Sequence, residues 1–516
     1  MSDTREAELL QQVLQKDEEI VRLSKENTLL RQKLDALARR LFGMKSEKLS
    51  PDQLQLLLQE MEAPGPAEGK GFGSQPTETE LSQPKKVSAR PERQPRIPEH
   101  LPVVEEVLLP EPVKAAPHRW RCIDPKGEVS TRIDFEPARF FQVRTLRPKY
   151  VERGAVDAVP INAPLPKTIL ERGIAAPGLV AQIVVAKYCD HLPLFRQESI
   201  YWTRHGVPLK RQSMAEWVGL AAFWLKPIYQ EIHRLVFKDG YAQLDETPGR
   251  YLAPGNGKTK LGYFWVGSNA RDETVFHWET SRAATCLENI VPADFKGVIQ
   301  CDGYEAYDCF AKRRGGQITL AGCMAHVRRK FVEASEHSPR TAGWFLLQFQ
   351  NLYAIESELR KNRAGPNLRQ AVRGHQSRPI MDRLHRALIR LKTKNRFIPQ
   401  SSMGKAINYA LRQWSSLLLF IDKGQLEIDN NRVENAIRPT AIGKKNWLFI
   451  GDAKAGERSA IIYTIIEACR RRKIDPWEYL RDVLTRLPSM TNHQIKDLTP
   501  EAWAKERQAK ALAAAA

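Results

Sequence analysis

The sequence predicts an α/β protein built from several parts. A core of strands and helices follows an N-terminal coiled coil, a linker and a small β-rich module. Three observations carry this prediction: a heptad repeat near the N-terminus, strand-like segments between residues 240 and 302, and helical periodicity from about residue 338 to 425. The chain has 516 residues, 42% of them hydrophobic, which is enough for several domains of ordinary size.

The charge of the chain indicates a large anionic partner. Lys and Arg number 80 against 60 Asp and Glu, a net charge of +20 that favours nucleic acid first and an acidic membrane surface second. The longest apolar runs, such as "GLVAQIVVA", are about half of the ~20 residues that a membrane span needs, and the N-terminus "MSDTREAELL" lacks an apolar signal segment. Seven cysteines without a CxxC pair are typical of reduced thiols. We therefore expect a cytoplasmic protein with no membrane partner.

A heptad repeat runs from Leu9 to Leu41. It predicts a coiled coil over residues 6–42, through which two chains dimerise. The polar Asn27 on the seam would fix the register and favour two parallel helices. Lys16, also on the seam, keeps an alternative open, an amphipathic helix packed on its own chain. The predicted dimer contacts are Val13, Ile20, Leu23, Asn27, Leu30, Leu34, Leu37 and Leu41.

Residues 45–100 and 101–165 differ in composition. The first stretch is rich in Pro, Gly, Ser and charge, cannot bury a core, and is predicted to be a disordered linker. The second holds strand-like stretches such as "VVEEVLLP" and "RFFQVRTL" and is predicted to be a small β-rich module. His118 and Cys122 could bind zinc there, but a structural site needs four ligands and no further Cys or His precedes Cys189, so zinc is not expected.

Residues 170–235 are predicted to be helical and could contact nucleic acid. The stretch "LPLFRQESIYWTRHGVPLKRQSMAEWVGLA" indicates one helix, a turn at "RHGVP" and a second helix with Ser213 as its N-cap and Glu216 three residues on. Two helices around such a turn outline a helix-turn-helix, with Lys210 and Arg211 near the start of the second helix. An ordinary helical hairpin fits the pattern at least as well.

Two acids follow strand-like segments. "GYAQLDETPGRY" predicts a short strand with Asp245 at or near its end and a turn at Pro248; "LGYFWVGSN" and "TVFHWETSR" complete an antiparallel meander. "GVIQCDGYEAY" predicts a buried strand that ends at Asp302. Neighbouring strand ends lie about 5 Å apart, and two carboxylates there repel unless they are protonated or bridged by cations. Taken alone, Asp245 could be a turn former and Asp302 the start of the helix "YEAYDCFAKR".

The stretch "LEIDNNRVENAIRP", from Leu426 to Pro439, offers three further acids. Asp429 is predicted to be the N-cap of a helix that Pro439 ends or kinks, and Glu427 to precede that helix in a loop. Glu434 lies inside the helix, on one face with Asn430 and Arg438. It could form a surface ion pair with Arg438. With the two Asp residues it could instead hold two Mg²⁺ ions that activate a nucleophile and stabilise the leaving oxygen of a phosphodiester.

Basic and aromatic residues near these acids could hold phosphates or stack on an unpaired base. Each could equally be a solvated charge, and Trp447 and Phe449 could belong to a core strand "WLFI". His326 could orient a phosphate or a carboxylate, or be a structural histidine. The candidate DNA contacts are Lys210, Arg211, His326, Arg328, Arg329, Lys330, Asn430, Arg438, Lys444, Lys445 and Trp447.

Six motifs occur in order: "HLPLFRQ", "LDETP", "CDGYEAY", "MAHVRRKF", "DNNRVENAIRP" and "GKKNWLFIG". With them the chain resembles the transposases of the insertion sequence 66 family, from "LFGMKSEKL" near Leu41 to "IDPWEYL" near Leu480. The resemblance implies a DDE-class enzyme with a ribonuclease-H-like core, in which Asp245, Asp302 and Glu434 are the catalytic acids and hold Mg²⁺ or Mn²⁺. It also implies a leucine zipper and accessory proteins of the same mobile element. One departure is that only Cys122 remains where the family carries a Cys-rich segment.

The resemblance and the periodicity together suggest how the chain is divided. The predicted parts are the first part of the core over 238–335, a helical insertion over 336–425, the helix of the third acid and a following strand over 426–455, and a C-terminal helical region over 456–516. We expect a DNA transposase that binds element ends and is nucleoid-associated when bound. The alternatives are a catalytically silent DNA-binding or architectural protein and a stand-alone metal-dependent nuclease.

Overall fold

The computed structural model describes residues 101–515 except 137–138, 154–158, 172, 254 and 256–257, together with residues 16, 19, 23 and 97. Leu23 is helical and exposed. The remaining predicted dimer contacts lie outside the described residues, as does nearly all of the predicted linker; these contacts are Val13, Ile20, Asn27, Leu30, Leu34, Leu37 and Leu41.

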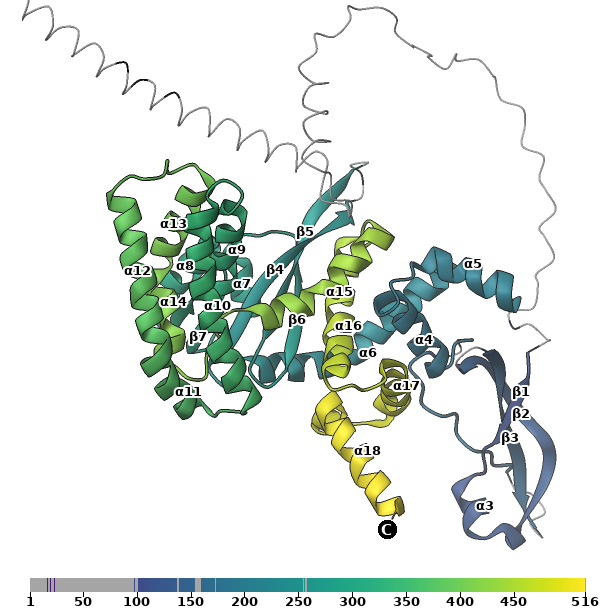
Figure 1. Cartoon of the computed structure of the whole chain (residues 1–516). Helices are drawn as coiled ribbons and strands as arrows, with labels where there is room; N and C mark the ends of the chain where they lie inside the picture. Colours follow the sequence, from purple (N-terminus) through teal and green to yellow (C-terminus); the bar gives the residue numbers. More distant parts are fainter. Residues whose placement is uncertain are drawn as a thin grey trace, which may run out of the picture. The chain divides into compact units, whose positions relative to one another are not determined.

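A three-stranded sheet opens the described part of the chain (Figure 1). Its strand order is β1-β3-β2, with β1 parallel and β2 antiparallel to the central β3. Gly127 and Glu128 both lie opposite Arg147, which makes a β-bulge, and Gly127 accepts the left-handed φ of +48° that the bulge requires. The strands are β1 (Val103–Val107), β2 (Trp120–Glu136) and β3 (Arg139–Glu152), and a short helix α3 (Glu111–Ala115) and a 3₁₀ turn η1 (Pro117–Arg119) separate the first two.

Three helices follow: α4 (Pro177–Tyr188), α5 (Leu194–His205) and α6 (Arg211–Phe237). The prediction that Ser213 caps the second helix of the hairpin is wrong, because α6 already begins at Arg211, whose N–H donates to Glu198 of α5 at 3.1 Å. α6 has 27 residues and contacts α4, α5, α16 and β6. These contacts fit the helical hairpin, the alternative to the helix-turn-helix.

A five-stranded mixed sheet forms the centre of the core (Figure 1). Its order is β6-β5-β4-β7-β8; β4, β5 and β6 form the predicted antiparallel meander, and β7 and β8 run parallel to β4. Aromatic and β-branched residues dominate "GYFWV" and "TVFHW", as expected for buried strands. The strands are β4 (Tyr241–Leu252), β5 (Thr259–Ser268), β6 (Thr274–Glu279), β7 (Gly297–Gln300) and β8 (Ile318–Ala321), and α7 (Cys286–Ile290) and α8 (Glu305–Arg313) connect the later ones.

Each face of this sheet is covered by its own hydrophobic core. Because side chains alternate along a strand, Ala242 and Ile299 join the core that contains α6 and α16, while Tyr241 and Val298 join a second core. The second core is made mainly of helices. They are α9 (Met324–Ala334), α10 (Pro339–Lys361), α12 (Arg378–Thr393), α13 (Ser402–Arg412) and α14 (Trp414–Asp422). Between α10 and α12 the chain forms α11 (Pro366–Val372) and a π-helix η2 (Arg373–Ser377), which add no side chain to this core.

The chain returns to the sheet through α15 (Asn431–Trp447) and α16 (Ala453–Arg471). α15 continues past Pro439, so Pro439 does not end it. The strand predicted at "WLFI" does not form: Leu448 has φ +60°, and Ile450 N–H donates to the carbonyl of Arg250 at 2.8 Å. The remaining elements are α17 (Pro476–Arg486), η3 (Leu487–Ser489), η4 (Asn492–Leu498) and α18 (Pro500–Ala515). Within the described part of the chain, no helix is both long and apolar enough to cross a membrane.

Candidate active site

Asp245 and Asp302 lie side by side at the point where two parallel strands part. Gln243 and Gln300 form the last parallel pair of β4 and β7, and each Asp follows two residues after its Gln. The prediction that Asp245 stands at the end of a short strand is wrong, since β4 continues beside β5 to Leu252. What ends near Asp245 is the pairing with β7, and this brings the two carboxylates together.

The environment of Asp245 disfavours its charged form. Burial and the negative charges of Glu246, Asp302 and Glu434 raise the pKa of Asp245 to about 8, although Glu246 N–H donates to its Oδ1 at 2.9 Å. Asp302 Oδ1 accepts the N–H of Tyr304 at 2.9 Å. Asp302 and Glu434 are therefore near enough to act electrostatically on Asp245, after the larger effects of burial and of Glu246.

Glu434 reaches this site from the first turn of α15. Its Oε2 accepts from Arg329 at 3.3 Å and its Oε1 lies 3.6 Å from His326 Nδ1, both on α9, so Glu434 contacts α9 and does not form the alternative ion pair with Arg438. Burial lowers the pKa of His326, which favours the neutral imidazole.

Glu434 lies among donor atoms of the kind that bind divalent cations. Glu434 Oε1 and His326 Nδ1 are buried and have no hydrogen-bond partner within the described structure. Cys323, His326 and Glu434 can bring ligand atoms within 4.8 Å of one another. Burial, however, raises the pKa of Cys323 to about 12, so its thiol stays protonated and is a poor ligand. Three carboxylates without a thiolate suit Mg²⁺ better than zinc.

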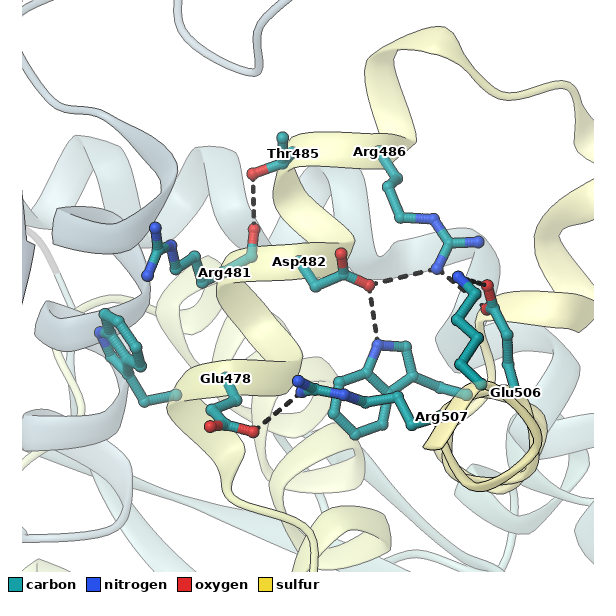
Figure 2. A pocket seen from close by; sticks show the side chains of 10 residues that line it. Glu478, Arg481, Asp482, Thr485, Arg486, Glu506 and Arg507 are labelled. Atoms are coloured by element: carbon teal, nitrogen blue, oxygen red, sulfur yellow. Dashed lines mark hydrogen bonds and ion pairs between the residues drawn. The ribbon is translucent and has the colours of Figure 1, made fainter. Parts of the chain in front are cut away.

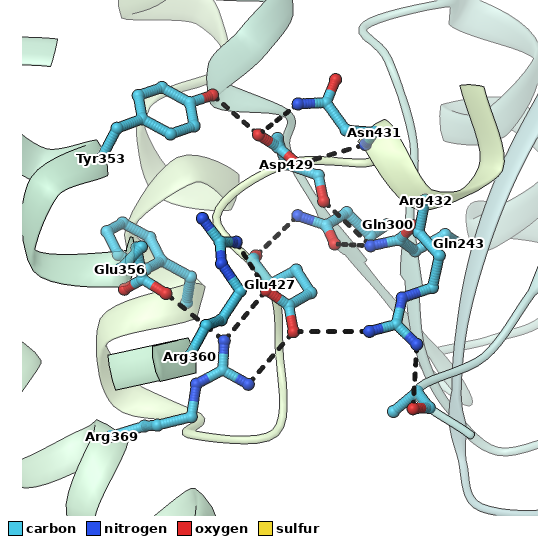
Figure 3. Close-up of polar contacts among 12 residues, drawn as sticks. Gln243, Gln300, Tyr353, Glu356, Arg360, Arg369, Glu427, Asp429, Asn431 and Arg432 are labelled. Atoms are coloured by element: carbon cyan, nitrogen blue, oxygen red, sulfur yellow. Dashed lines mark hydrogen bonds and ion pairs between the residues drawn. The ribbon is translucent and has the colours of Figure 1, made fainter. Parts of the chain in front are cut away.

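The loop before α15 is held by Gln243 and Gln300, the last parallel pair of β4 and β7 (Figure 3). Gln300 Nε2 donates to the carbonyl of Glu427 and Gln243 Nε2 to that of Asp429, each at 2.9 Å. Gln243 Nε2 also donates to Gln300 Oε1 at 3.1 Å. The start of α15, and with it Glu434, is thus held against β4 and β7.

The side chains of Glu427 and Asp429 serve structure (Figure 3). Arg369 donates two hydrogen bonds to Glu427, at 3.1 and 3.0 Å. Burial alone would raise the pKa of Glu427, but this guanidinium, with those of Arg432 and Arg360, outweighs burial and holds the pKa below its usual range. Asp429 accepts from Tyr353 Oη at 2.8 Å and from Asn431 N–H at 3.1 Å. The predicted N-cap was one residue early, because Asn430 occupies that position.

The predicted DNA contacts are exposed, half-buried or buried in the structure. Lys444 is held by the carbonyl of Pro248 at 3.2 Å, and Lys330 lies 5.3 Å from the ring centre of Tyr409. Asn430 is fully buried, so its side chain is not available for the predicted DNA contact. Exposed are Lys210, Arg211, Arg328, Arg329, Arg438 and Lys445, and half-buried are His326, Lys330, Lys444 and Trp447.

A separate pocket lies between α17 and α18 (Figure 2). Three of its four cations are paired: Arg486 contacts Asp482 at 3.2 Å and Glu506 at 3.1 Å, Arg507 contacts Glu478 at 2.8 Å, and Lys510 contacts Glu506 at 2.6 Å, while Arg481 lies 5.1 Å from the ring centre of Trp477. Because acidic neighbours compensate these charges, the pocket offers little attraction for a phosphate, and we assign it no part in the site.

Known proteins are similar to this chain over most of its length. A family model described as "Transposase IS66 family" matches residues 172–458. The chain belongs to the IS66 transposase family. Two further models match, "IS66 C-terminal element" at residues 464–500 and "Transposase C of IS166 homeodomain" at residues 29–105. The resemblance seen in the six motifs is thereby confirmed.

Three relatives come from Sinorhizobium fredii (strain NBRC 101917 / NGR234). "Uncharacterized protein y4jD" is 33% identical over 80% of this chain and 83% of its own length. "Uncharacterized protein y4qI" is 33% identical over 88% of this chain and 85% of its own length. "Uncharacterized protein y4hP" is 28% identical over 94% of this chain and 90% of its own length. Membership of the IS66 family indicates a DNA-transposing enzyme with DNA as its substrate.

One group of residues in this IS66-family site escaped the sequence reasoning. Glu246, next to Asp245, is nearly buried and accepts from Tyr307 Oη at 2.9 Å and from Arg282 Nε at 2.8 Å. Arg282 lies 3.8 Å from the ring centre of Tyr304, whose N–H binds Asp302. The signal in the sequence was the adjacent pair Asp245 and Glu246 in "LDETP". Hydrophobic patterning could not show that the second acid is also buried in the site.

Proposed function

We propose that this IS66-family protein binds the ends of its mobile element and catalyses Mg²⁺-dependent phosphodiester hydrolysis and strand transfer, with Asp245, Asp302 and Glu434 as catalytic, metal-binding acids. One observation carries the proposal: burial and the negative charges of Glu246, Asp302 and Glu434 raise the pKa of Asp245 to about 8, where two neighbouring parallel strands part beside the start of α15. Such a cluster is costly unless cations bind it, and it therefore points to chemistry.

The sheet supports a ribonuclease-H-like core. Its order β6-β5-β4-β7-β8, with β5 alone antiparallel to both neighbours, places the first acid on the central strand and the second just after the adjacent one. In this reading α10 to α14 are an insertion that packs on one face of the sheet. The assignment to a DDE enzyme rests partly on this analogy of fold.

The residues around the acids suit a phosphodiester. Two Mg²⁺ or Mn²⁺ ions held by the three carboxylates would supply an activated nucleophile and stabilise the leaving oxygen. Arg329, exposed beside Glu434, is placed to hold a phosphate oxygen. Water forms a new P–O bond at the element's end as the bond to the 3′ oxygen breaks. The freed 3′-hydroxyl then attacks a target phosphate, whose own 3′ oxygen leaves.

The wider setting follows from the same proposal. Two element ends must be held together for strand transfer, which suits a homodimer or a higher oligomer formed through the N-terminal heptads. Accessory proteins of the same element are expected partners. The protein is expected in the cytoplasm, nucleoid-associated when bound to DNA.

The deciding experiment replaces Asp302 by Asn and measures cleavage and joining of element-end DNA in Mg²⁺. Both activities should vanish while end binding persists, and Asp308→Asn, an exposed acid on α8, should leave them unchanged. Retained cleavage in Asp302→Asn would refute the assignment. Wild-type protein that binds ends without nicking them would instead be a silent DNA-binding protein, and one that cuts but cannot join a precut end would be a nuclease.

A further inference from the structure

A cavity of about 770 Å³ lies beside α15, between this helix, α16 and the segment that follows α4. Asn435, the residue after Glu434, lines it. The sequence motifs "HLPLFRQ" and "DNNRVENAIRP" both contribute to its wall, yet the proposed chemistry uses neither His191 nor Asn435. The volume is within the range of pockets that hold small organic ligands.

The inner wall of the cavity is aromatic. It contains Tyr188, Phe276 and Tyr463, all buried. Tyr463 packs edge-on against Tyr188 with ring centres 5.1 Å apart, and its ring centre is 5.6 Å from that of Phe276. Ile442 and Ile466 add apolar surface. A planar, weakly polar group would find a matching surface here.

His191 supplies a polar atom that the fold leaves unused. Its Nδ1 is buried without a hydrogen-bond partner in the described structure, and its backbone has the left-handed φ of +58° that residues other than glycine rarely adopt. α15 approaches it closely at Gly443, where a Cβ would stand 3.2 Å from Nδ1. Burial lowers the pKa of His191, which favours the neutral ring. An unsatisfied buried polar atom is costly, and the wall of this cavity holds one.

The mouth of the cavity is positively charged. Arg438 and Lys473 line it and are exposed, and neither has an acidic partner among the described residues. Arg470 is also present but is paired with Glu467 at 2.7 Å. An aromatic interior behind two free cations matches a ligand that is planar at one end and anionic at the other.

We propose that this cavity holds one unpaired nucleotide of the DNA substrate, with its base against the aromatic wall and its phosphate at Arg438 and Lys473. The inference rests on the proposed function, because it takes DNA as the substrate. Arg438 follows Glu434 by four residues, about 6 Å along the helix axis, so one strand can pass from the carboxylates to the cavity. The exposed amide of Asn435 is then available to the edge of the base.

The test compares DNA binding with Ca²⁺ in place of Mg²⁺, so that no reaction is required. The probes are a short blunt duplex and the same duplex ending in an unpaired aminopurine, a fluorescent base analogue. Full-length protein should bind the second probe about tenfold more tightly and quench its fluorescence, as stacking on an aromatic side chain does. Asn435→Trp and Ile442→Trp, at exposed rim positions, should fill the mouth and abolish both effects while binding to the blunt duplex persists.

Leu347→Trp, at an exposed position on α10, is the matched control and should behave as wild type. Equal affinity of wild-type protein for the two probes would overturn the inference, and so would a preference that survives in both rim variants, as it would if the cavity receives a peptide. Failure of the catalytic proposal is distinguishable: if Asp302→Asn retains joining but the rim variants lose the preference, the triad is wrong and the nucleotide site stands.

Discussion

Asp245 offers a quantitative test of the carboxylate cluster. Its pKa is raised to about 8 in the folded protein, whereas an unfolded Asp ionises near pH 4. The folded state therefore binds one proton more than the unfolded state between these values. The stability that this proton contributes is complete below about pH 4 and is lost as the pH rises through about 8. Integrated from pH 5 to pH 9, the loss is on the order of 4 kcal/mol at 1.36 kcal/mol per pKa unit.

Asp245→Asn removes this titration and keeps the shape of the side chain, and its Oδ1 can still accept the N–H of Glu246. In EDTA, the variant should be more stable than wild type at high pH, and its advantage should shrink by about 4 kcal/mol between pH 9 and pH 5. The measurement is urea unfolding of both proteins across this range. Mg²⁺ should stabilise wild type more than the variant, because a cation favours the ionised carboxylate.

Asp308→Asn, which changes an exposed acid on α8, controls for the general effect of lost negative charge and should show no such trend. Parallel stability curves for wild type and Asp245→Asn would refute the reasoning, since they would mean that Asp245 ionises in the folded protein much as it does in the unfolded chain.

Two further substitutions test how the site is supported. Glu356→Gln removes the charge partner of Arg373, and both side chains are fully buried. The variant should therefore lose about 3–5 kcal/mol of stability in urea unfolding. The control Glu358→Gln, at an exposed position on the same helix, should change stability by less than about 0.5 kcal/mol. Gly297→Ala would place a Cβ 2.0 Å from the carbonyl oxygen of Gly240, at a position where φ is +153°. The variant should lose about 2 kcal/mol of stability, which lowers the melting temperature by several degrees. An unchanged melting temperature would show that the start of β7 can shift freely.

Local patterning predicted part of this fold. The alternation in "GYFWV" and "TVFHW" was enough to place the meander, and helical spacing was enough to put Glu434 inside a helix. β4 was longer than predicted because Pro248 was taken as a turn. Beyond Gln243 this strand pairs with β5 but no longer with β7, and a sheet edge tolerates a residue without an N–H.

Other features depended on partners far away in the chain. Asp429 receives its hydrogen bond from Tyr353, 76 positions earlier, and the loop at Glu427 is held by Arg369 and by Gln300. Such partners leave no local trace in the sequence. In "LEIDNNRVENAIRP", two acids anchor the loop and one is a candidate ligand. The sequence distinguished Glu434 by its position in the helix, but only the tertiary structure shows that Arg369 anchors Glu427.

The wide spacing of the three acids has a consequence for the newly made protein. The two Asp residues are synthesised early, but Glu434 leaves the ribosome 132 residues after Asp302, and its helix docks on a loop whose anchors Arg369 and Tyr353 belong to the helical segment in between. A nascent or prematurely terminated chain thus displays two carboxylates without the third. On the proposed function, the site would be complete only when translation has passed the helical segment and that segment has folded, so an unfinished chain would lack the third acid.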